Sequence, residues 1–271
     1  MWKDKIRNLI RKKPVISFFI LTFLISWIIW IPLIGATEDS SRYVMLFLYI
    51  GGLGPLLSGI IVSKITNTLK DFKETNLKFK IPYIWYIVSI FLPILMYAFG
   101  YLLFILIGGE GINLAETPSF FIYPLLLLYV IFLGGGLEEP GWRGYALPNL
   151  QKKYSPFISS LIVGVFWIIW HLPLFFSELT SQQGIPLIWY SITAIALSFI
   201  FTIIYNKSKR STVTSVLLHG GVNAPTAWFP MYAIVSTQYG DISSYVVIAF
   251  ITWVTFFMLL LFLRPNFFTK E

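Results

Sequence analysis

Long apolar runs recur along the whole chain, and they restrict it to folds that cross a membrane. A helix needs about 20 apolar residues to span the hydrocarbon core of a bilayer, and such runs lie at residues 14–36, 43–63, 83–108, 120–147, 156–176, 186–205, 211–229 and 245–263. Only 12% of the 271 residues are charged, about half the fraction typical of soluble domains. We therefore predict an all-α, polytopic membrane helix bundle with about eight transmembrane helices, in which residues 14–263 form a single domain.

Lysine and arginine residues gather in alternate connections between these runs. Nineteen of the twenty lie in the segments 3–13, 64–80, 143–153, 207–210 and 264–270, whereas the other connections hold only Arg42, together with six acidic residues. Cytoplasmic connections of membrane proteins carry an excess of Lys and Arg. The sequence therefore predicts a multi-pass protein of the cell membrane with both termini in the cytoplasm. Because membrane orientation explains the net charge of +8, no nucleic-acid partner is predicted.

The two ends of the chain are basic and lie outside the apolar runs. In residues 1–13, apolar side chains recur at helical spacing among the basic ones: Trp2, Ile6, Leu9 and Ile10. This pattern is typical of a helix that lies on an anionic leaflet, and a basic tail that only fixes orientation is the alternative. The apolar run that follows is too long for the core of a signal peptide, so we expect it to be retained as the first span. Residues 264–271 are predicted to form a cytoplasmic tail.

Ionisable side chains inside the apolar runs are few, and such groups usually mark function because hydrocarbon makes them costly. They are Glu138, Glu139, Arg143, His171 and His219, joined by the amide of Asn223. The chain has no other histidine and no cysteine, which excludes thiolate metal ligands and cysteine nucleophiles. These side chains come from three predicted spans and form the inventory of a candidate site.

The first part of this inventory lies in the segment GGGLEEPGWRG, at residues 134–144. On a helix, Glu139 and Arg143 are four residues apart and can form an ion pair, while Glu138 projects about 100° away and stays free. Pro140 predicts a kink that leaves backbone carbonyls of the preceding turn open, and the three glycines permit close approach of another segment. The alternative is a turn at the membrane edge with an interfacial ion pair.

The two histidines lie in different settings. His171 follows Trp167 by four residues in the aromatic stretch WIIWHLP, and a lone histidine of this kind is often a hydrogen-bonded structural group. His219 and Asn223 are also four residues apart, so they share a helix face, with two glycines beside them. Two such donors can stabilise the oxyanion of a tetrahedral intermediate, or they can form hydrogen bonds between helices.

Together these groups are able to hydrolyse an amide without a covalent intermediate. Glu138 would act as the general base with help from His171, and His219 and Asn223 would be the oxyanion donors. No cofactor is required in this mechanism. The alternative is a zinc site formed by Glu138, His171 and His219, but the chain lacks the His-Glu-x-x-His pair that would bring two ligands onto one helix.

The order of these motifs resembles a known family. The sequence is similar to the CPBP intramembrane proteases in three motifs. They are Glu-Glu-x-x-x-Arg at Glu138 to Arg143, an aromatic residue four positions before His171, and His-x-x-x-Asn at His219 to Asn223. That family includes the type II CAAX prenyl endopeptidases, the Abi proteins and bacteriocin self-immunity proteins. The resemblance covers residues 120–230. It departs from the family at Trp167, where Phe is usual, and Pro140 and Gly141 lie inside the first motif.

The resemblance implies roles for the candidate residues. Glu138 and His171 would activate water, His219 and Asn223 would line the oxyanion site, and Glu139 and Arg143 would support them. The family is usually called a metalloprotease family. That name is contested, because a mechanism in which glutamate activates the water has also been assigned to it.

The leading functional hypothesis is an intramembrane endopeptidase that cleaves a membrane-associated protein, peptide or lipopeptide. One alternative is a non-catalytic scaffold or bacteriocin immunity protein that binds a partner in the same cavity. Another is a proton-coupled transporter, because intramembrane acids and histidines also serve proton relays. The Ile- and Lys-rich composition favours a bacterial source.

Overall fold

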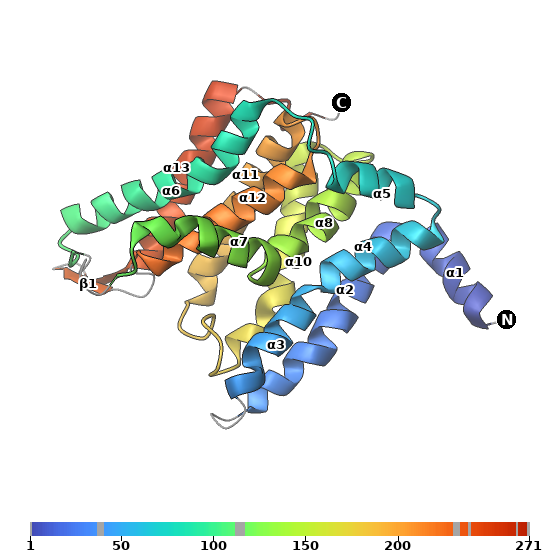
Figure 1. The fold of residues 1–271 in the computed structure, drawn as a ribbon, viewed down its shortest axis with the longest axis horizontal. Helices are drawn as coiled ribbons and strands as arrows, with labels where there is room; N and C mark the ends of the chain where they lie inside the picture. The colour runs from blue at the N-terminus through green and yellow to red at the C-terminus, as the bar shows by residue number, and fades with distance from the viewer. Residues whose placement is uncertain are drawn as a thin grey trace.

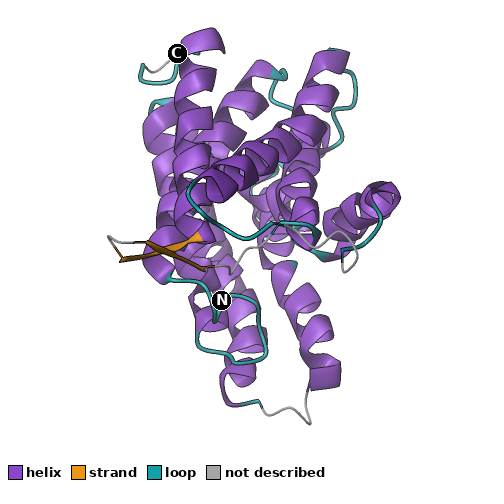
Figure 2. Ribbon diagram, turned by 90° about the vertical axis from the view of Figure 1, so that its left-hand side faces the viewer, coloured by secondary structure: helices purple, strands orange, loops and turns teal. Residues whose placement is uncertain are grey.

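The fold is a bundle of helices, as the apolar runs predict (Figure 1). The computed structural model describes residues 2–36, 41–111, 117–229, 234–237, 240–263 and 265–269. Within these ranges the only sheet is an antiparallel hairpin of β1 (Ile234–Thr237) and β2 (Gly240–Ser243), which lies at the edge of the bundle in Figure 2. The predicted all-α class is therefore confirmed.

Thirteen α-helices occur among the described residues. They are α1 (Trp2–Lys12), α2 (Pro14–Trp30), α3 (Ser41–Gly52), α4 (Gly54–Ile65), α5 (Leu69–Asn76), α6 (Tyr83–Leu106), α7 (Tyr123–Leu133), α8 (Glu139–Gly141), α9 (Leu147–Gln151), α10 (Pro156–Phe175), α11 (Leu187–Lys207), α12 (Thr212–Asn223) and α13 (Ser244–Leu263).

Seven helical segments of the described chain are long and apolar enough to cross a membrane. They are Pro14–Gly35, Arg42–Ile65, Tyr83–Leu106, Phe120–Gln151, Pro156–Phe175, Leu187–Lys207 and Ser244–Leu263. Each coincides with one of the eight runs predicted from the sequence. The chain is thus a multi-pass membrane protein.

The structure differs from the predicted eight spans at residues 211–229. Helix α12 has only 12 residues, which at 1.5 Å per residue reach about 18 Å, short of the roughly 30 Å of a hydrocarbon core. A 3₁₀ turn, Ala224–Ala227, follows it and contains Pro225. Helix α12 packs against α6, α7 and α11, and Figure 1 shows it in the middle of the bundle. The apolar run is therefore a short buried helix that ends inside the bundle.

The fourth predicted span is not one continuous helix. Between α7 and α9 the backbone passes through a 3₁₀ turn (Gly136–Glu138), the short α8, and a π-helical turn (Trp142–Ala146). Gly135 has φ +114°, a conformation that residues with a Cβ rarely adopt. The span is broken near Pro140, as predicted, but Glu139 keeps right-handed helical geometry (φ −62°, ψ −35°), so the left-handed residue of the break is Gly135 and not a neighbour of the proline. Irregular backbone of this kind is tolerated inside a membrane only where protein buries it or where it lines a cavity.

The basic connections meet at one end of the bundle. Three hydrogen bonds join them: Arg11 Nε donates to the Ile65 carbonyl (3.0 Å), Lys78 Nζ to the Lys209 carbonyl (2.7 Å), and the Phe157 N–H to the Phe267 carbonyl (2.8 Å). Figure 1 shows α1, α5 and the C-terminus toward the right and top, and the hairpin at the opposite end. Part of the charge pattern, at residues 38–39, 116, 264 and 270, lies outside the described residues. Which end faces the cytoplasm stays a prediction.

Candidate active site

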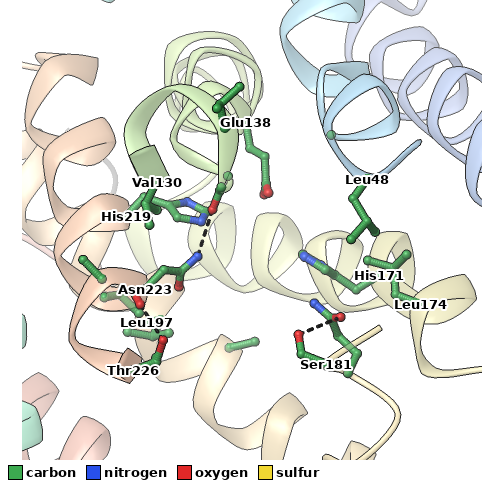
Figure 3. A pocket seen from close by; sticks show the side chains of 18 of the residues that line it. Leu48, Val130, Glu138, His171, Leu174, Ser181, Leu197, His219, Asn223 and Thr226 are labelled. Atoms are coloured by element: carbon green, nitrogen blue, oxygen red, sulfur yellow. Dashed lines mark hydrogen bonds between the residues drawn. The ribbon is translucent and has the colours of Figure 1, made fainter. Parts of the chain in front are cut away.

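The candidate residues come from three parts of the bundle and meet at one cavity. The irregular segment between α7 and α9 carries Glu138, α10 carries His171, and α12 carries His219 and Asn223. All four side chains line a cavity of about 710 Å³ (Figure 3). The structure therefore brings together the four residues to which the sequence analysis gave catalytic roles.

Glu139 is the centre of a buried charged network behind this cavity. Arg143 Nη1 donates to Glu139 Oε1 at 3.1 Å, which confirms the ion pair predicted from their spacing. His219 Nδ1 lies 2.9 Å from the same oxygen, and because a carboxylate oxygen accepts, the imidazole donates. Glu139 and Arg143 are fully buried. This network fixes the ring of His219 and leaves its Nε2 toward the cavity.

The contact of His219 with Glu139 was not predicted. The two residues are 80 positions apart, so no local pattern in the sequence links them. Arg143 is also held by α11, since its Nη2 donates to Ser198 Oγ at 3.4 Å and its guanidinium lies 4.5 Å from the centre of the Phe201 ring. A buried ion pair needs further contacts to offset its desolvation, and Ser198, Phe201 and His219 supply some of them, whereas Arg143 Nε and Glu139 Oε2 have no hydrogen-bond partner among the described residues.

Glu138 takes no part in the ion pair of Glu139 and Arg143, as predicted, but the prediction that it stays free is wrong. Its Oε2 accepts a hydrogen bond of 2.9 Å from Trp167 Nε1. Sequence reasoning noticed Trp167 only as an aromatic wall and missed this donor. The available signal was chemical: a buried indole N–H usually finds a hydrogen-bond partner.

The orientation of His171 is set by its own helix. Its Nδ1 lies 2.8 Å from the carbonyl oxygen of Trp167; since a carbonyl only accepts, Nδ1 carries the proton and Nε2 is the free acceptor. The rings of Trp170 and Tyr190 contact the imidazole, with centroids 4.7 and 5.6 Å away. A histidine held in this way presents a lone pair to the cavity.

Gly134 and Gly135 form the wall between Glu138 and α12. A Cβ atom at Gly135 would lie 2.5 Å from His219 Nε2 and 3.0 Å from Glu138 Oε1. The side chains of His219 and Glu138 therefore both lie close to the backbone of Gly135. Asn223 Nδ2 donates to the Gly134 carbonyl at 3.1 Å. An amide nitrogen has two N–H groups, and this bond uses one of them.

The cavity also reaches the outer surface of the bundle. On one side it is lined by Met45 and Leu48 of α3, and on the other by Tyr129 and Phe132 of α7. Met45 and Phe132 are more than half exposed, although they line the cavity as well. Both helices belong to segments that are long and apolar enough to span a membrane, so the exposed residues on this side of the cavity come from α3 and α7.

The proposed metal ligands do not form a ready-made metal site. Across the described ranges, no three or more His, Asp or Glu side chains are grouped so that they could hold one ion. Each predicted ligand already has a protein partner: Glu138 binds Trp167, His219 binds Glu139, and His171 binds its own backbone. These partners leave His171 Nε2, His219 Nε2 and Glu138 Oε1 without a bond to the described part of the chain, and a metal-ligating histidine commonly donates its other ring N–H to a carboxylate or a carbonyl in this way. The zinc alternative stays a prediction.

Two comparisons with known proteins indicate the family of this chain. Residues 120–225 match the family described as Type II CAAX prenyl endopeptidase Rce1-like. The chain is also 30% identical over 226 residues to CAAX prenyl protease 2 of Methanococcus maripaludis, covering 76% of this chain and 81% of that protein. The segment that matches the family, residues 120–225, contains every residue of the candidate site.

Proposed function

Because this chain belongs to the type II CAAX prenyl endopeptidases and is an intramembrane endopeptidase, we propose that it hydrolyses a peptide bond of a membrane-associated substrate with water activated by Glu138. The observation that carries this proposal is the shared cavity, where Glu138, His171, His219 and Asn223 meet. The roles of these residues and the substrate are proposals that rest on the contacts described above.

Glu138 acts as the general base in this mechanism. Its Oε2 is held by Trp167, and its Oε1 lies on the side of Gly135 and His219. Oε1 takes a proton from water, whose oxygen attacks the substrate carbonyl carbon, and the carboxyl group then delivers that proton to the leaving amine. His171 orients the water, because its unprotonated Nε2 accepts one of the water's hydrogen bonds.

His219 and the amide of Asn223 stabilise the oxyanion of the tetrahedral intermediate. Glu139 fixes the ring of His219 through Nδ1. His219 therefore donates to the oxyanion from Nε2 as an imidazolium, in which both ring nitrogens carry a proton. Asn223 contributes its second N–H. Preorganised donors of this kind are among the largest single contributions to acyl transfer.

The substrate enters from the bilayer, between α3 and α7. A lipid-modified peptide has an apolar chain that fits between the apolar side chains of these helices, while its peptide reaches the polar wall formed by Glu138 and His219. The similar protein of Methanococcus maripaludis is named a CAAX prenyl protease, so a prenylated C-terminal peptide is the first substrate to test. The basic end of the bundle faces the cytoplasm, which follows the excess of Lys and Arg there.

The test uses purified protein in liposomes and a fluorescence-quenched peptide with a farnesylated cysteine three residues from its C-terminus. We expect cleavage of this peptide, and its loss in Glu138→Gln, His171→Ala and His219→Ala. Glu178→Gln makes the same chemical change at an exposed position outside the cavity and should retain activity. Unimpaired turnover in any of the three site variants would refute the role assigned to that residue.

Two further results decide between this proposal and its alternatives. We expect full activity in a chelator, and metal analysis by inductively coupled plasma of the active protein should find less than stoichiometric metal. A scaffold or immunity function is indicated instead if Glu138→Gln preserves full biological protection in cells.

A further inference from the structure

Trp167 contacts most of the ionisable side chains of the site. Its indole N–H binds Glu138 at 2.9 Å, and the guanidinium of Arg143 lies 5.3 Å from its ring centre. Its ring also meets both imidazoles edge to face, with centroids 5.6 Å from His171 and 5.9 Å from His219. The side chain is 6% exposed. One tryptophan therefore joins the candidate base to the other groups that surround it.

The indole fixes which carboxylate oxygen of Glu138 faces the reaction. An indole N–H only donates, and a donor bound to a carboxylate forms a stronger bond than one between neutral groups. The bond engages Oε2, so Oε1 is the oxygen on the Gly135 and His219 side. Without the indole, the carboxylate is free to rotate, and Oε2 loses its buried donor.

The neighbouring tryptophans show that burial alone does not create such a bond. Trp142 and Trp170 are both fully buried, yet within the described chain their Nε1 atoms have no hydrogen-bond partner. Of these three tryptophans, Trp167 lines the cavity, and its N–H reaches the carboxylate of Glu138 there. The bond to Glu138 is therefore a specific feature of this position.

We propose that Trp167 is a positioning residue, which holds Glu138 with Oε1 toward the attacking water. This inference rests on the proposed function, because it takes Glu138 as the general base. Trp167 acts through Glu138 and is not itself a catalytic group. The aromatic ring alone, as in phenylalanine, would keep the cavity wall but would lose the orientation of the base.

The first test is Trp167→Phe, which keeps an aromatic ring and removes the N–H. A hydrogen bond to a charged group is typically worth enough to change a rate by about 10- to 100-fold, and we expect about a tenfold fall in kcat. KM should stay within about threefold, because the substrate still meets an aromatic wall. The matched control is Trp253→Phe, which loses an indole bond to the Ile192 carbonyl (3.1 Å) outside the cavity and should keep its kcat.

A second variant separates the hydrogen bond from packing. Benzothienylalanine, incorporated at position 167 alone, has the shape of tryptophan with sulfur in place of the N–H. The inference predicts the same fall in kcat as for Trp167→Phe. A kcat within twofold of wild type in this isosteric variant overturns the inference, even if Trp167→Phe is impaired or does not fold.

The Glu138→Gln variant distinguishes failure of the inference from failure of the proposed function. If Glu138→Gln is inactive while the isosteric variant at position 167 is fully active, only the positioning role is wrong. If Glu138→Gln cleaves the farnesylated peptide normally, the proposed base is wrong and the inference falls with it.

Discussion

Replacing Gly135 by alanine should disable the site with the smallest possible change in side chain. The added Cβ would lie 2.5 Å from His219 Nε2 and 3.0 Å from Glu138 Oε1. Carbon atoms in ordinary contact are about 3.5–4.0 Å apart, so the imidazole must move by about 1 Å. A misplacement of that size can cost about 100-fold in rate. We therefore expect kcat to fall about 100-fold in Gly135→Ala.

The same substitution should also reduce stability. Gly135 has φ +114°, and a residue with a Cβ held in such a region costs about 1–3 kcal/mol. Thermal unfolding in lipid nanodiscs measures this loss and shows whether the variant is folded at the temperature of the rate assay. Gly35→Ala is the matched control, because nothing lies within 4 Å of its added Cβ; its rate and unfolding temperature should match those of wild type. Turnover of Gly135→Ala within twofold of wild type would show that Glu138 and His219 do not border the reacting centre.

Three further predictions follow from the contacts of the site and from the topology. Arg143→Met leaves the carboxylate of Glu139 buried without its cation, and we expect a loss of about 3–5 kcal/mol in the free energy of unfolding; an unchanged denaturation profile would contradict the network. Asn223→Ala should lower kcat by about 100-fold with little change in KM, and steady-state rates over a range of substrate concentrations check this. The chain has no cysteine, so single cysteines at Lys12 and Glu178 report sidedness: an impermeant maleimide added to intact cells should label only the second.

The spacing of residues was enough to predict local parts of the site. The ion pair of Glu139 and Arg143 follows from their separation of four positions, and it forms although a π-helical turn carries the arginine. A break near Pro140 was expected from the missing N–H and the restricted backbone of proline, although Glu139 keeps helical geometry and the left-handed residue is Gly135. Both features depend on neighbours in the chain, where the geometry of a helix limits the outcomes.

The contacts between helices could not be predicted in the same way. Nothing in the sequence indicates that His219 meets Glu139 rather than Glu138, because the choice depends on how α12 is rotated against the irregular segment. The bond from Trp167 to Glu138 depends likewise on the packing of α10. The end of α12 was missed because residues 211–229 were taken as one apolar span. The helix ends at Asn223, two residues before Pro225, and the proline was the available signal, since proline is common just after a helix ends.

If the substrate enters the cavity between α3 and α7, as proposed, its concentration must be counted in the membrane and not in the solution. A substrate that arrives sideways through the bilayer diffuses in two dimensions, and the quantity that sets its encounter rate is its mole fraction in lipid. Diluting the liposomes with buffer should then leave turnover per enzyme unchanged, whereas adding inert phospholipid to the same liposomes slows it. The apparent potency of an inhibitor will likewise follow its partition coefficient into the bilayer as much as its fit to the cavity.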